Sequence, residues 1–530
     1  MKNKYFGVGL LLIFLAGLLL RTVNLSSNPP HLGNDEISIA FDSYSVRTIG
    51  RDEHGVAYPL SFKSHQTYKA PLYGYLNMPF NFLFGNNELG VRFLSALSGS
   101  ILVLVVGLMA RESVNPWVGI ISALLMALNP KAITVSRMAF ESNLAVLVMT
   151  MGVWMMYRYK NLKTNIYLVL AGVLLGFSIW GYHTQWGLTP LLAVILPFIW
   201  KKEISFKKWW TMWVLVVIIA LPMFLNFLMV QRRDVNNRAS SQLWLSDGQL
   251  QDYLKNNHDS WLRKTWTAGT GPINNYLGQI DLAGMFGNGI DLFEGSYPLE
   301  QGWFLLGCLP LVVLGLWKGK IIFGNDFKWL LVWLLLCPIV PALTVGGITS
   351  VRNISMLVPA IIIMAGGAKW LFENKRKWFL GLIPFLVFNF GVFVVAYYIQ
   401  FPKFSADGFQ YGYKQAWEFI KPRAENYDLV VVEPKFGRYG QFVGVAHLYF
   451  GYFGAFPVEA MQKRTDGDGT RIGKYWFKEV DWNREELKPK SLYVVSVINP
   501  IAGEAGGKLS LLEEIKKPGG EVQFLIYEVN

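Results

Sequence analysis

The sequence predicts an α-helical protein that crosses a membrane many times and ends in a small α/β domain. Of its 530 residues, 52% are hydrophobic and only 16% are charged, whereas a soluble chain is typically about 25% charged. The hydrophobic residues gather in blocks of membrane-spanning length, and this pattern stops near residue 400. A single water-soluble domain is therefore excluded, and the 15% aromatic content excludes a disordered chain.

The hydrophobic blocks have the length that a helix needs to cross a hydrocarbon core of about 30 Å, roughly 17–22 residues. We expect about eleven transmembrane helices. They are predicted near 6–24, 89–109, 115–129, 138–157, 165–181, 185–200, 209–229, 302–317, 328–345, 352–372 and 378–399.

The first block follows Met-Lys-Asn-Lys, as either a signal peptide or an anchor helix would. Arg21 and Thr22 come directly after Leu20, where signal cleavage would need small residues. We therefore expect this block to be retained as a helix, with its N-terminus in the cytoplasm.

The net charge of +13 is explained by where the lysines and arginines lie. They fall at alternate helix ends, which the positive-inside rule assigns to the cytoplasm. This leaves 25–88, 230–301 and 400–530 on the extracytoplasmic side, and an odd number of spans puts the C-terminus there too. No nucleic-acid partner is needed to explain the charge. The basic ends carry Lys2, Lys4, Arg111, Arg158, Lys160, Lys163, Lys201, Lys202, Lys207, Lys208, Lys318, Lys320, Lys375, Arg376 and Lys377.

Two domains are predicted: a transmembrane catalytic domain over 1–400, with outer loops at 25–88 and 230–301, and an extracytoplasmic α/β domain over 401–530. In the second domain, short β-rich runs alternate with helical stretches. It has no GxGxxG between a strand and a helix, so no dinucleotide is assigned. Strands are expected at Leu429–Glu433, Leu492–Val497 and Gln523–Val529, and helices at Gln415–Lys421 and Ser510–Lys517.

Cysteines and histidines give little support to a metal or disulfide centre. Cys308 and Cys337 lie inside predicted spans, where they are expected to be small core residues. The six histidines show no HExxH or His-x-x-x-His spacing, so no metal ligands are assigned. His31, His54 and His65 are close enough in sequence to leave a divalent cation possible.

The first outer segment carries an adjacent pair of acids, Asp35 and Glu36, ahead of a helix-like stretch. One interpretation makes Asp35 the N-cap of that helix, with Glu36 adding favourable charge to its first turn. The other makes the pair catalytic, with one carboxylate acting as a general base at the membrane surface. Neighbouring helical residues point about 100° apart, so only one of the two would face a substrate.

Lys69 stands in the apolar, aromatic stretch Tyr68-Lys69-Ala70-Pro71-Leu72. It is either a lysine that extends toward water or a cation that holds a lipid phosphate at headgroup depth. Arg137 and Glu141 are four residues apart and form either an intrahelical ion pair or part of a functional site, because charges at membrane depth are costly.

Further candidates lie in two outer turns. Arg352 comes before a predicted helix, where it is either a solvated loop residue or a binder of anions. Tyr182 and His183 lie near Gln185 and Trp186, where they would stack on a sugar or belong to an interfacial aromatic belt. We group Tyr182 and His183 with Tyr68 as candidate residues for binding the acceptor or the sugar.

The order of these motifs resembles that of the GT-C membrane glycosyltransferases. More closely, it is similar to the family 39-like group that includes protein O-mannosyltransferases and lipid A aminoarabinose transferases. The chain departs from that group in having Lys69-Ala70-Pro71 where many members have Lys-Pro-Pro, and in lacking a WWD-type signature. The resemblance rests on GNDEISIAFDSYS, YKAPLYGYL, GVRFLSALSG, SRMAFESN, GYHTQWGLTP, INNYLGQIDLAGMFG and VRNISMLVP, which together cover about the first 400 residues.

The resemblance implies an inverting transfer of a sugar from a polyprenyl phosphate to a hydroxyl acceptor on a protein, lipid or glycan, at the extracytoplasmic face of the cell membrane. It implies Asp35 as the base and Glu36 and Glu141 as catalytic or positioning carboxylates. Lys69, Arg137 and Arg352 would bind the donor phosphate and offset its charge, so that no cofactor is required.

Two other function classes remain open at this stage. A transporter or flippase of polyprenyl-linked glycans would need polar groups at mid-membrane and broken helices in pairs. The polar residues of this chain gather at one face instead, which disfavours transport. An O-antigen-ligase-like protein or a sensor would place recognition in the domain over 401–530.

Overall fold

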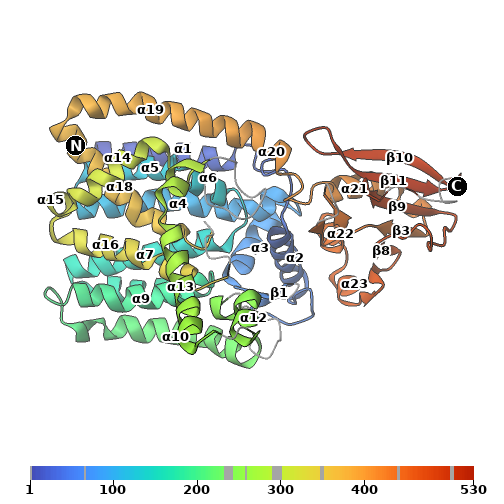
Figure 1. Ribbon diagram of the computed structural model, residues 1–530, viewed down its shortest axis with the longest axis horizontal. Helices are drawn as coiled ribbons and strands as arrows, with labels where there is room; N and C mark the ends of the chain where they lie inside the picture. The colour runs from blue at the N-terminus through green and yellow to red at the C-terminus, as the bar shows by residue number, and fades with distance from the viewer. Residues whose placement is uncertain are drawn as a thin grey trace.

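The computed structural model describes residues 3–64, 67–231, 243–256, 259–288, 301–345, 351–437, 442–499, 501 and 507–530. It shows a bundle of long helices with a sheet-containing domain at one end (Figure 1). The N-terminus lies at the end of the bundle that is farther from this domain. The predicted fold class, a polytopic helical protein with a C-terminal α/β domain, is confirmed.

The bundle contains helices that run back and forth along one direction (Figure 1). Its main core joins residues of α1, α4, α5, α7–α10, α14, α16 and α18 in one hydrophobic cluster. The helices are α1 (Asn3–Thr22), α4 (Glu88–Ser113), α5 (Pro116–Ala127), α6 (Pro130–Ser136), α7 (Glu141–Leu162), α8 (Asn165–Ile179), α9 (Thr184–Ile199), α10 (Trp210–Met229), α14 (Leu309–Trp317), α15 (Gly319–Phe323), α16 (Phe327–Leu336), α17 (Ile339–Ala342), α18 (Leu357–Asn374) and α19 (Arg376–Val394).

Among the described residues, six helices are long and apolar enough to cross a membrane. Helices α5 and α6 together satisfy the same criterion but meet at a bend of 57°. Shorter apolar helices cover Asn165–Ile179, Thr184–Ile199 and Leu306–Trp317. The predicted number of about eleven spans goes beyond these counts and stays a prediction.

Polar caps set several helix boundaries in the bundle. The side chain of Asn87 accepts from the backbone N–H of Gly90 at the start of α4, and Asn115 caps α5 in the same way. Asn129 accepts from the backbone N–H of Ala132 and so starts α6 immediately after the bend. Each cap satisfies N–H groups that the first turn of a helix leaves without a partner.

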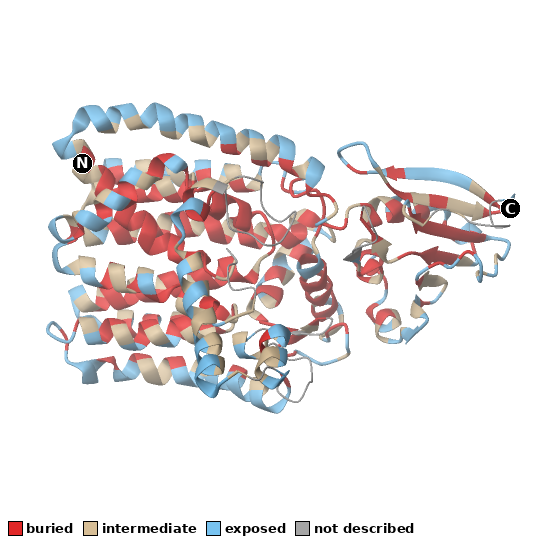
Figure 2. Cartoon of the chain, viewed as in Figure 1, coloured by how far each residue is buried: buried red, intermediate tan, exposed pale blue. Residues whose placement is uncertain are grey.

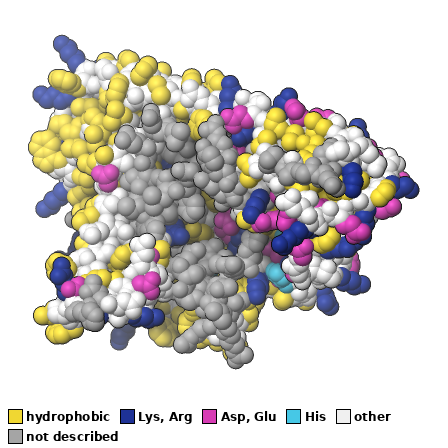
Figure 3. Space-filling model, turned by 45° about the vertical axis from the view of Figure 1, so that its right-hand side comes forward, with side chains coloured by type: hydrophobic (Ala, Val, Ile, Leu, Met, Phe, Trp, Pro, Cys, Tyr) yellow, Lys and Arg dark blue, Asp and Glu magenta, His cyan; other side chains and the backbone are white. Residues whose placement is uncertain are grey.

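The last helix of the bundle, α19, lies along its outside. Only 6% of its most apolar window is buried, compared with 89% for α18 (Figure 2). Exposed apolar helices of this length match the hydrocarbon thickness of a bilayer, so α19 is suited to face lipid, as are α1 and α10, which are also mostly exposed. Figure 3 shows hydrophobic side chains over the bundle and many charged side chains over the other domain.

The first outer segment folds into α2 (Asn34–Ile49), the hairpin β1 (Phe62–Ser64) and β2 (Thr67–Lys69), and α3 (Leu72–Phe84). The strands pair antiparallel, with Phe62 opposite Lys69. Helix α2 is buried along most of its length between the bundle and the C-terminal domain, as Figure 2 shows. The segment therefore forms the link between the two domains.

The second outer segment contains α12 (Gly248–Asn256), the short helix η3 (Trp244–Ser246) and α13 (Trp261–Gln279). Helix α13 runs across the direction of the bundle helices rather than along it (Figure 1). The side chain of Ser260 caps the start of α13, because it accepts a hydrogen bond from the backbone N–H of Arg263.

The C-terminal domain is built on a seven-stranded sheet in the order β10-β11-β9-β3-β8-β7-β6. β3 is parallel to both of its neighbours, β8 and β9, and the remaining pairs are antiparallel. Its strands are β3 (Leu429–Val432), β6 (Thr465–Gly467), β7 (Gly469–Ile472), β8 (Tyr475–Phe477), β9 (Ser491–Ser496), β10 (Leu509–Lys516) and β11 (Val522–Val529); β4 (Lys435–Phe436) pairs with β5 (Phe442–Val443), and the helices are α20 (Phe401–Phe404), α21 (Tyr413–Ile420), α22 (Ala446–Phe453) and α23 (Val458–Gln462).

The predicted strands and the predicted helix at Gln415–Lys421 are confirmed to within two residues at each end. The predicted helix at Ser510–Lys517 is wrong, because β10 occupies Leu509–Lys516 and pairs with β11. Leu, Glu and Lys favour helices in isolation. Here, pairing with a strand that is itself held in the sheet outweighs that local preference.

The two domains share one hydrophobic cluster. It contains Ile37 and Phe41 of α2 together with Tyr449 and Phe450 of α22. Polar contacts reinforce it, because the hydroxyl of Tyr449 donates to the carbonyl of Leu32 at 2.7 Å. The C-terminal domain is therefore packed onto the first outer segment, next to the candidate catalytic residues.

Candidate active site

Asp35 and Lys69 form an ion pair at the start of α2. The Lys69 Nζ lies 3.2 Å from Oδ1 of Asp35 and donates to the Asp35 backbone carbonyl at 3.0 Å. The lysine side chain is only 2% exposed, whereas that of Asp35 is 61% exposed. A buried cation thus holds a carboxylate that still faces the surroundings of the protein. The structure therefore brings these two candidate residues together.

The local structure of α2 explains why Asp35 is exposed. Gly33 is the N-cap of the helix, so the interpretation of Asp35 as the N-cap is wrong. Glu36 closes the capping box instead, since its Oε2 accepts from the Gly33 backbone N–H at 2.9 Å. Asp35, one residue earlier, points about 100° away from Glu36, and its side chain is 61% exposed.

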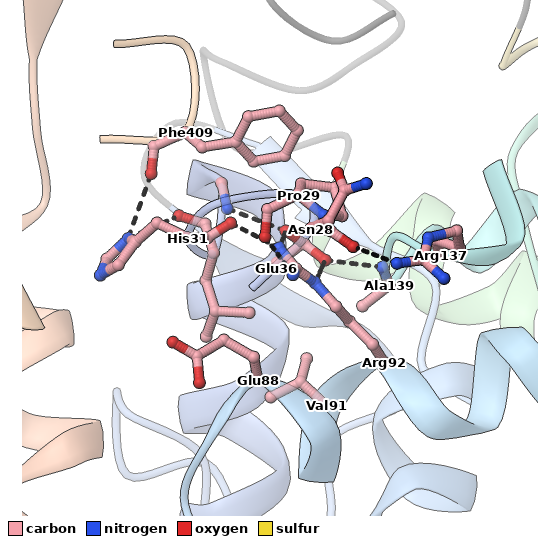
Figure 4. A network of polar contacts seen from close by, with 12 residues as sticks. Asn28, Pro29, His31, Glu36, Glu88, Val91, Arg92, Arg137, Ala139 and Phe409 are labelled. Atoms are coloured by element: carbon pink, nitrogen blue, oxygen red, sulfur yellow. Dashed lines mark hydrogen bonds and ion pairs between the residues drawn. The ribbon is translucent and has the colours of Figure 1, made fainter. Parts of the chain in front are cut away.

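Glu36 is buried and fully engaged (Figure 4). Its carboxylate receives two hydrogen bonds from Arg92 of α4, each at 2.8 Å, and one from the Ala139 backbone N–H at 2.8 Å. With the bond from Gly33, both oxygens have two donors. Glu36 therefore connects α2 to α4 and to the α6–α7 turn, and its expected catalytic or positioning role stays a prediction.

Arg92 was missed by the sequence reasoning, which placed it within the apolar block at 89–109. Its guanidinium is completely buried and donates to Glu36 and to the backbone carbonyls of Leu25, Pro29 and His31. The signal was present in the sequence, because an arginine inside an apolar run must find an anionic or carbonyl partner.

Arg137 is also buried, in the turn that ends α6. It donates to the backbone carbonyls of Leu20, Asn24 and Asn28, and Figure 4 shows the bond to Asn28. The ring centroid of Tyr398 lies 4.9 Å from its guanidinium carbon. These contacts tie the α6–α7 turn to the α1–α2 connection, and the predicted contact of Arg137 with a donor phosphate stays a prediction.

Glu141 is the first residue of α7 and is 7% exposed. Since Arg137 precedes the break between α6 and α7, the interpretation of the two as an intrahelical pair is wrong. Ala139, which donates to Glu36, lies two residues before Glu141. Glu141 therefore lies close to the contact between the α6–α7 turn and α2, and its expected role stays a prediction.

A second group of predicted residues lines a cavity of about 280 Å3 between α9, α10, α17 and the residues Leu343, Thr344 and Arg352. Arg352 lies in its wall and donates through Nη1 to the Thr344 hydroxyl at 2.6 Å and to the Val345 carbonyl at 2.9 Å. Tyr182 and His183 lie in the wall too, so the structure brings these three predicted residues together. The lining is Tyr182, His183, Thr184, Trp186, Phe227, Gln231, Leu243, Val340, Leu343, Thr344 and Arg352.

Hydrogen bonds link the first outer segment, which carries Asp35 and Lys69, to the helices around the cavity. Leu72, three residues after Lys69, donates its backbone N–H to the carbonyl of Trp180 at 3.2 Å. On the other side, the hydroxyl of Ser61 donates at 2.8 Å to Asn226, which also accepts from Gln231 of the cavity wall. Tyr68 is buried beside Lys69, with the Lys63 ammonium 5.9 Å from its ring centroid.

An acidic cluster of Asp42, Asp52 and Glu53, all of them buried, was not predicted from the sequence. Asp42 lies seven residues after Asp35, on the same face of α2, and burial together with the charges of Glu53 and Asp52 raises its pKa well above the usual value. For Glu53, burial opposes ionisation, but contacts with His54 and Arg464 outweigh it and lower the pKa. The positive charge of Lys69 lowers the pKa of Asp42 and so opposes the effect of these acids.

The histidines are scattered. His31 is buried between the two domains, His183 lines the cavity, and His65 and His258 lie outside the described residues. Within the part of the chain that is described, no group of three His, Cys, Asp or Glu side chains could hold a metal ion. Cys308 and Cys337 are free and buried, as expected from their place in spans.

Comparison with known proteins finds similarity to glycosyltransferases. Residues 68–229 match the family described as dolichyl-phosphate-mannose-protein mannosyltransferase. A Bacillus subtilis (strain 168) protein named as a mannosyltransferase, YycA, is 25% identical over 212 residues, which are 39% of this chain. The match spans only 30% of the length of YycA.

The whole fold is similar to solved structures of glycosyltransferases. ArnT from Cupriavidus metallidurans in the apo state is 14% identical, with a TM-score of 0.55, and the match covers 98% of each chain. The oligosaccharyltransferase AglB from Archaeoglobus fulgidus, solved with an inhibitory peptide and a dolichol-phosphate, is 12% identical, with a TM-score of 0.50. That match covers 87% of this chain and 64% of AglB. The chain therefore shares its fold with these solved glycosyltransferases, and its residues 68–229 are similar to the mannosyltransferase family.

Proposed function

We propose that the protein transfers a sugar, with inversion, from a polyprenyl-phosphate donor to a hydroxyl acceptor at the membrane surface next to the C-terminal domain. The observation that carries this proposal is the unequal placement of the two acids of the Asp35-Glu36 pair. Glu36 is buried with its hydrogen bonds complete, whereas Asp35 is 61% exposed and held by a buried lysine. Such a carboxylate can take a proton from an acceptor hydroxyl.

In the proposed reaction, the acceptor oxygen attacks the anomeric carbon of the sugar and its proton passes to Asp35. The bond between that carbon and the phosphate oxygen breaks, and polyprenyl phosphate leaves. Lys69 orients Asp35, and its ammonium lies beside the carboxylate that takes up the proton during the reaction. Preorganised cations stabilise such a transition state because they need no reorganisation when the charge develops.

The cavity around Arg352 is the proposed place of the donor phosphate and sugar. An arginine offers several N–H groups to phosphate oxygens, and Tyr182, His183 and Trp186 supply ring faces on which a sugar can stack. The dolichol-phosphate named with AglB supports a lipid phosphate as the ligand of this fold. With lysine and arginine available, the proposal requires no metal ion, and the effect of a divalent cation is part of its test.

The proposal also includes the orientation of the protein in the membrane. Lysines and arginines gather at the helix ends on the same side of the bundle as the N-terminus, which favours a cytoplasmic N-terminus. The C-terminal domain, at the other end of the bundle (Figure 1), is then extracytoplasmic. The proposed membrane is the cell membrane, and the acceptor is a protein, a lipid or a glycan.

The test is mass spectrometry of envelope glycoconjugates from cells that contain or lack the protein, combined with labelled polyprenyl-phosphate sugars supplied to the purified protein. We expect one sugar-modified product to require both the protein and the lipid donor, with or without a chelator. Movement of the intact labelled lipid across a vesicle membrane without formation of a glycoconjugate would favour a flippase and reject the proposal.

A further inference from the structure

Helix α13 has its apolar side chains on the outside. Leu262, Trp266, Ile273 and Leu277 are 62%, 73%, 60% and 56% exposed. Their spacings of four, seven and four residues put them on one face of the helix. We call these four residues the α13 stripe.

The opposite face of α13 is small or polar and points into the protein. It carries Ala268, Gly271, Asn275 and the fully buried Gln279. The carbonyl of Ala268 accepts from the Trp244 indole at 2.9 Å, and Gly271 lies so close to that ring that a Cβ would clash with it. A helix on the surface of a soluble protein shows the reverse arrangement, with its apolar face inward.

This inverted arrangement matches the place of α13 beside the bundle. The helix runs across the direction of the membrane-spanning helices (Figure 1). The hydroxyl of Tyr276 donates at 2.9 Å to the carbonyl of Leu335, which belongs to the candidate span Gly319–Ala342. A helix that lies along a bilayer surface puts Trp and Leu into the interface between headgroups and acyl chains.

The composition of the stripe fits a lipid surface. Tryptophan is enriched at membrane interfaces, where its ring sits at headgroup level, and leucine inserts beside it into the interface between headgroups and acyl chains. Arg263, on the flank of the stripe, is paired with Asp259 at 3.4 Å, so this pair adds no net charge beside the stripe. The occupant that these observations select is therefore the bilayer surface.

The inward face of α13 supports the wall of the Arg352 cavity. Asn275 donates to the carbonyls of Ala342 and Thr344, at 3.2 and 3.3 Å. Thr344 in turn accepts from Arg352 through its hydroxyl. The Trp244 backbone N–H donates to Leu343 at 2.9 Å, so η3 connects α13 to the same wall.

We propose that the α13 stripe docks on the bilayer surface on the side of the C-terminal domain, and that this docking holds the cavity wall that carries Thr344 and Arg352. The link to the cavity rests on the proposed function, because it concerns the binding of the lipid donor. The docking itself does not depend on it.

The docking is tested with a fluorophore attached to single cysteines, in a protein whose Cys308 and Cys337 are replaced by alanine and which is placed in lipid nanodiscs. The stripe positions are Trp266→Cys and Ile273→Cys. The matched controls are Arg263→Cys and Asn274→Cys, which are also exposed but lie on the flank of the same helix. We expect lipids that carry a quencher near the headgroup to reduce emission several-fold more at the stripe than at the flank.

Equal quenching at all four positions, or none, would overturn the docking. Stripe labels that report an apolar environment but are shielded from the lipid quencher would overturn it too, because a protein partner would then cover the stripe. This arm needs no catalytic activity, so its outcome is independent of the proposed function.

The link to the cavity is tested with the double variant Leu262→Ser/Ile273→Ser against Arg263→Ser/Asn274→Ser. We expect the stripe variant to raise the apparent KM for the polyprenyl-phosphate sugar several-fold with kcat retained, and the flank variant to change neither. Melting temperatures of both variants are compared with the parent protein. Stripe labels that are quenched together with an unchanged KM would overturn the link while leaving the docking in place.

Discussion

Arg92 and Glu36 form a buried ion pair through two hydrogen bonds, from Nε to Oε1 and from Nη2 to Oε2, each 2.8 Å long. Neither side chain is more than 3% exposed. The pair joins α2 to α4, and Glu36 also accepts from Ala139 in the α6–α7 turn. Glu36 thus connects three separate parts of the chain directly beside Asp35, the candidate base.

Breaking this pair should destabilise the protein strongly. We expect Glu36→Gln to lower the free energy of unfolding by about 3–5 kcal/mol, because it leaves Arg92 charged and buried without its anion. The measurement is thermal or denaturant unfolding in detergent. The control is Glu112→Gln, whose pair with Arg158 is partly exposed and should contribute about 1 kcal/mol or less. Equal losses in the two variants would contradict the assigned role.

Asp35→Asn should abolish transfer while the fold is retained. The amide has nearly the shape of the carboxylate but cannot take a proton, and loss of a general base lowers kcat about 100- to 10,000-fold. Because Asp35 is exposed, expression and melting temperature should stay near those of the parent. Initial rates with a labelled donor measure the effect, and near-normal turnover would reject the assignment of the base.

Lys69→Met should reduce turnover by acting on Asp35. The buried ammonium is within 3.2 Å of the Asp35 carboxylate, so its loss frees that side chain to adopt other rotamers. In the Asp35→Asn background the same substitution should have little further effect, as expected when two residues act as a unit. Additive losses in this double-mutant cycle would show that Lys69 acts independently of Asp35.

Arg352→Gln should weaken donor binding. If its guanidinium contacts the donor phosphate, we expect kcat/KM to fall about tenfold or more, mainly through KM, since a charge-assisted hydrogen bond contributes about 1.5–3 kcal/mol. Donor titrations at saturating acceptor measure this change. Arg263→Gln, an exposed arginine outside the cavity, is the control. An unchanged KM would remove Arg352 from the donor site.

The junction between the domains should weaken in mild acid. The His31 imidazole lies at hydrogen-bonding distance from the carbonyls of Leu32 and Phe409 through Nδ1, and its Nε2 is buried without a partner. Burial lowers the pKa of His31 to about 4, against opposing contributions such as the charge of Glu88, while Lys414 lowers it further.

The sign follows from linkage. The unfolded chain binds a proton near pH 6.5 and the folded chain only near pH 4, so stability is complete above pH 6.5 and decreases as the pH falls toward 4. Between pH 7 and pH 5 the loss is about 2 kcal/mol. Melting temperatures measured across this range should fall less in His31→Asn than in the parent. An identical pH dependence in both would contradict the assignment.

Local sequence was enough to predict the helical class and the strands Leu429–Val432 and Ser491–Ser496, whereas the functional role of the Asp35 region stays a prediction. It could not predict which of Asp35 and Glu36 stays exposed, because both fit a first helical turn equally well. Arg92, brought in from another helix, decides it by binding Glu36. A contact from elsewhere in the chain also explains why the segment Ser510–Lys517, expected to be a helix, is a strand: it pairs with β11.

Hydrophobic length and charge position are properties of neighbouring residues, so the sequence alone predicts the membrane-spanning helices and the gathering of the charged candidates toward one face. The meeting of Tyr182, His183 and Arg352 in one cavity and the outward apolar face of α13 emerge only from the folded chain. Those outcomes depend on contacts between residues far apart in the chain, and the orientation of a helix face is chosen by what surrounds it.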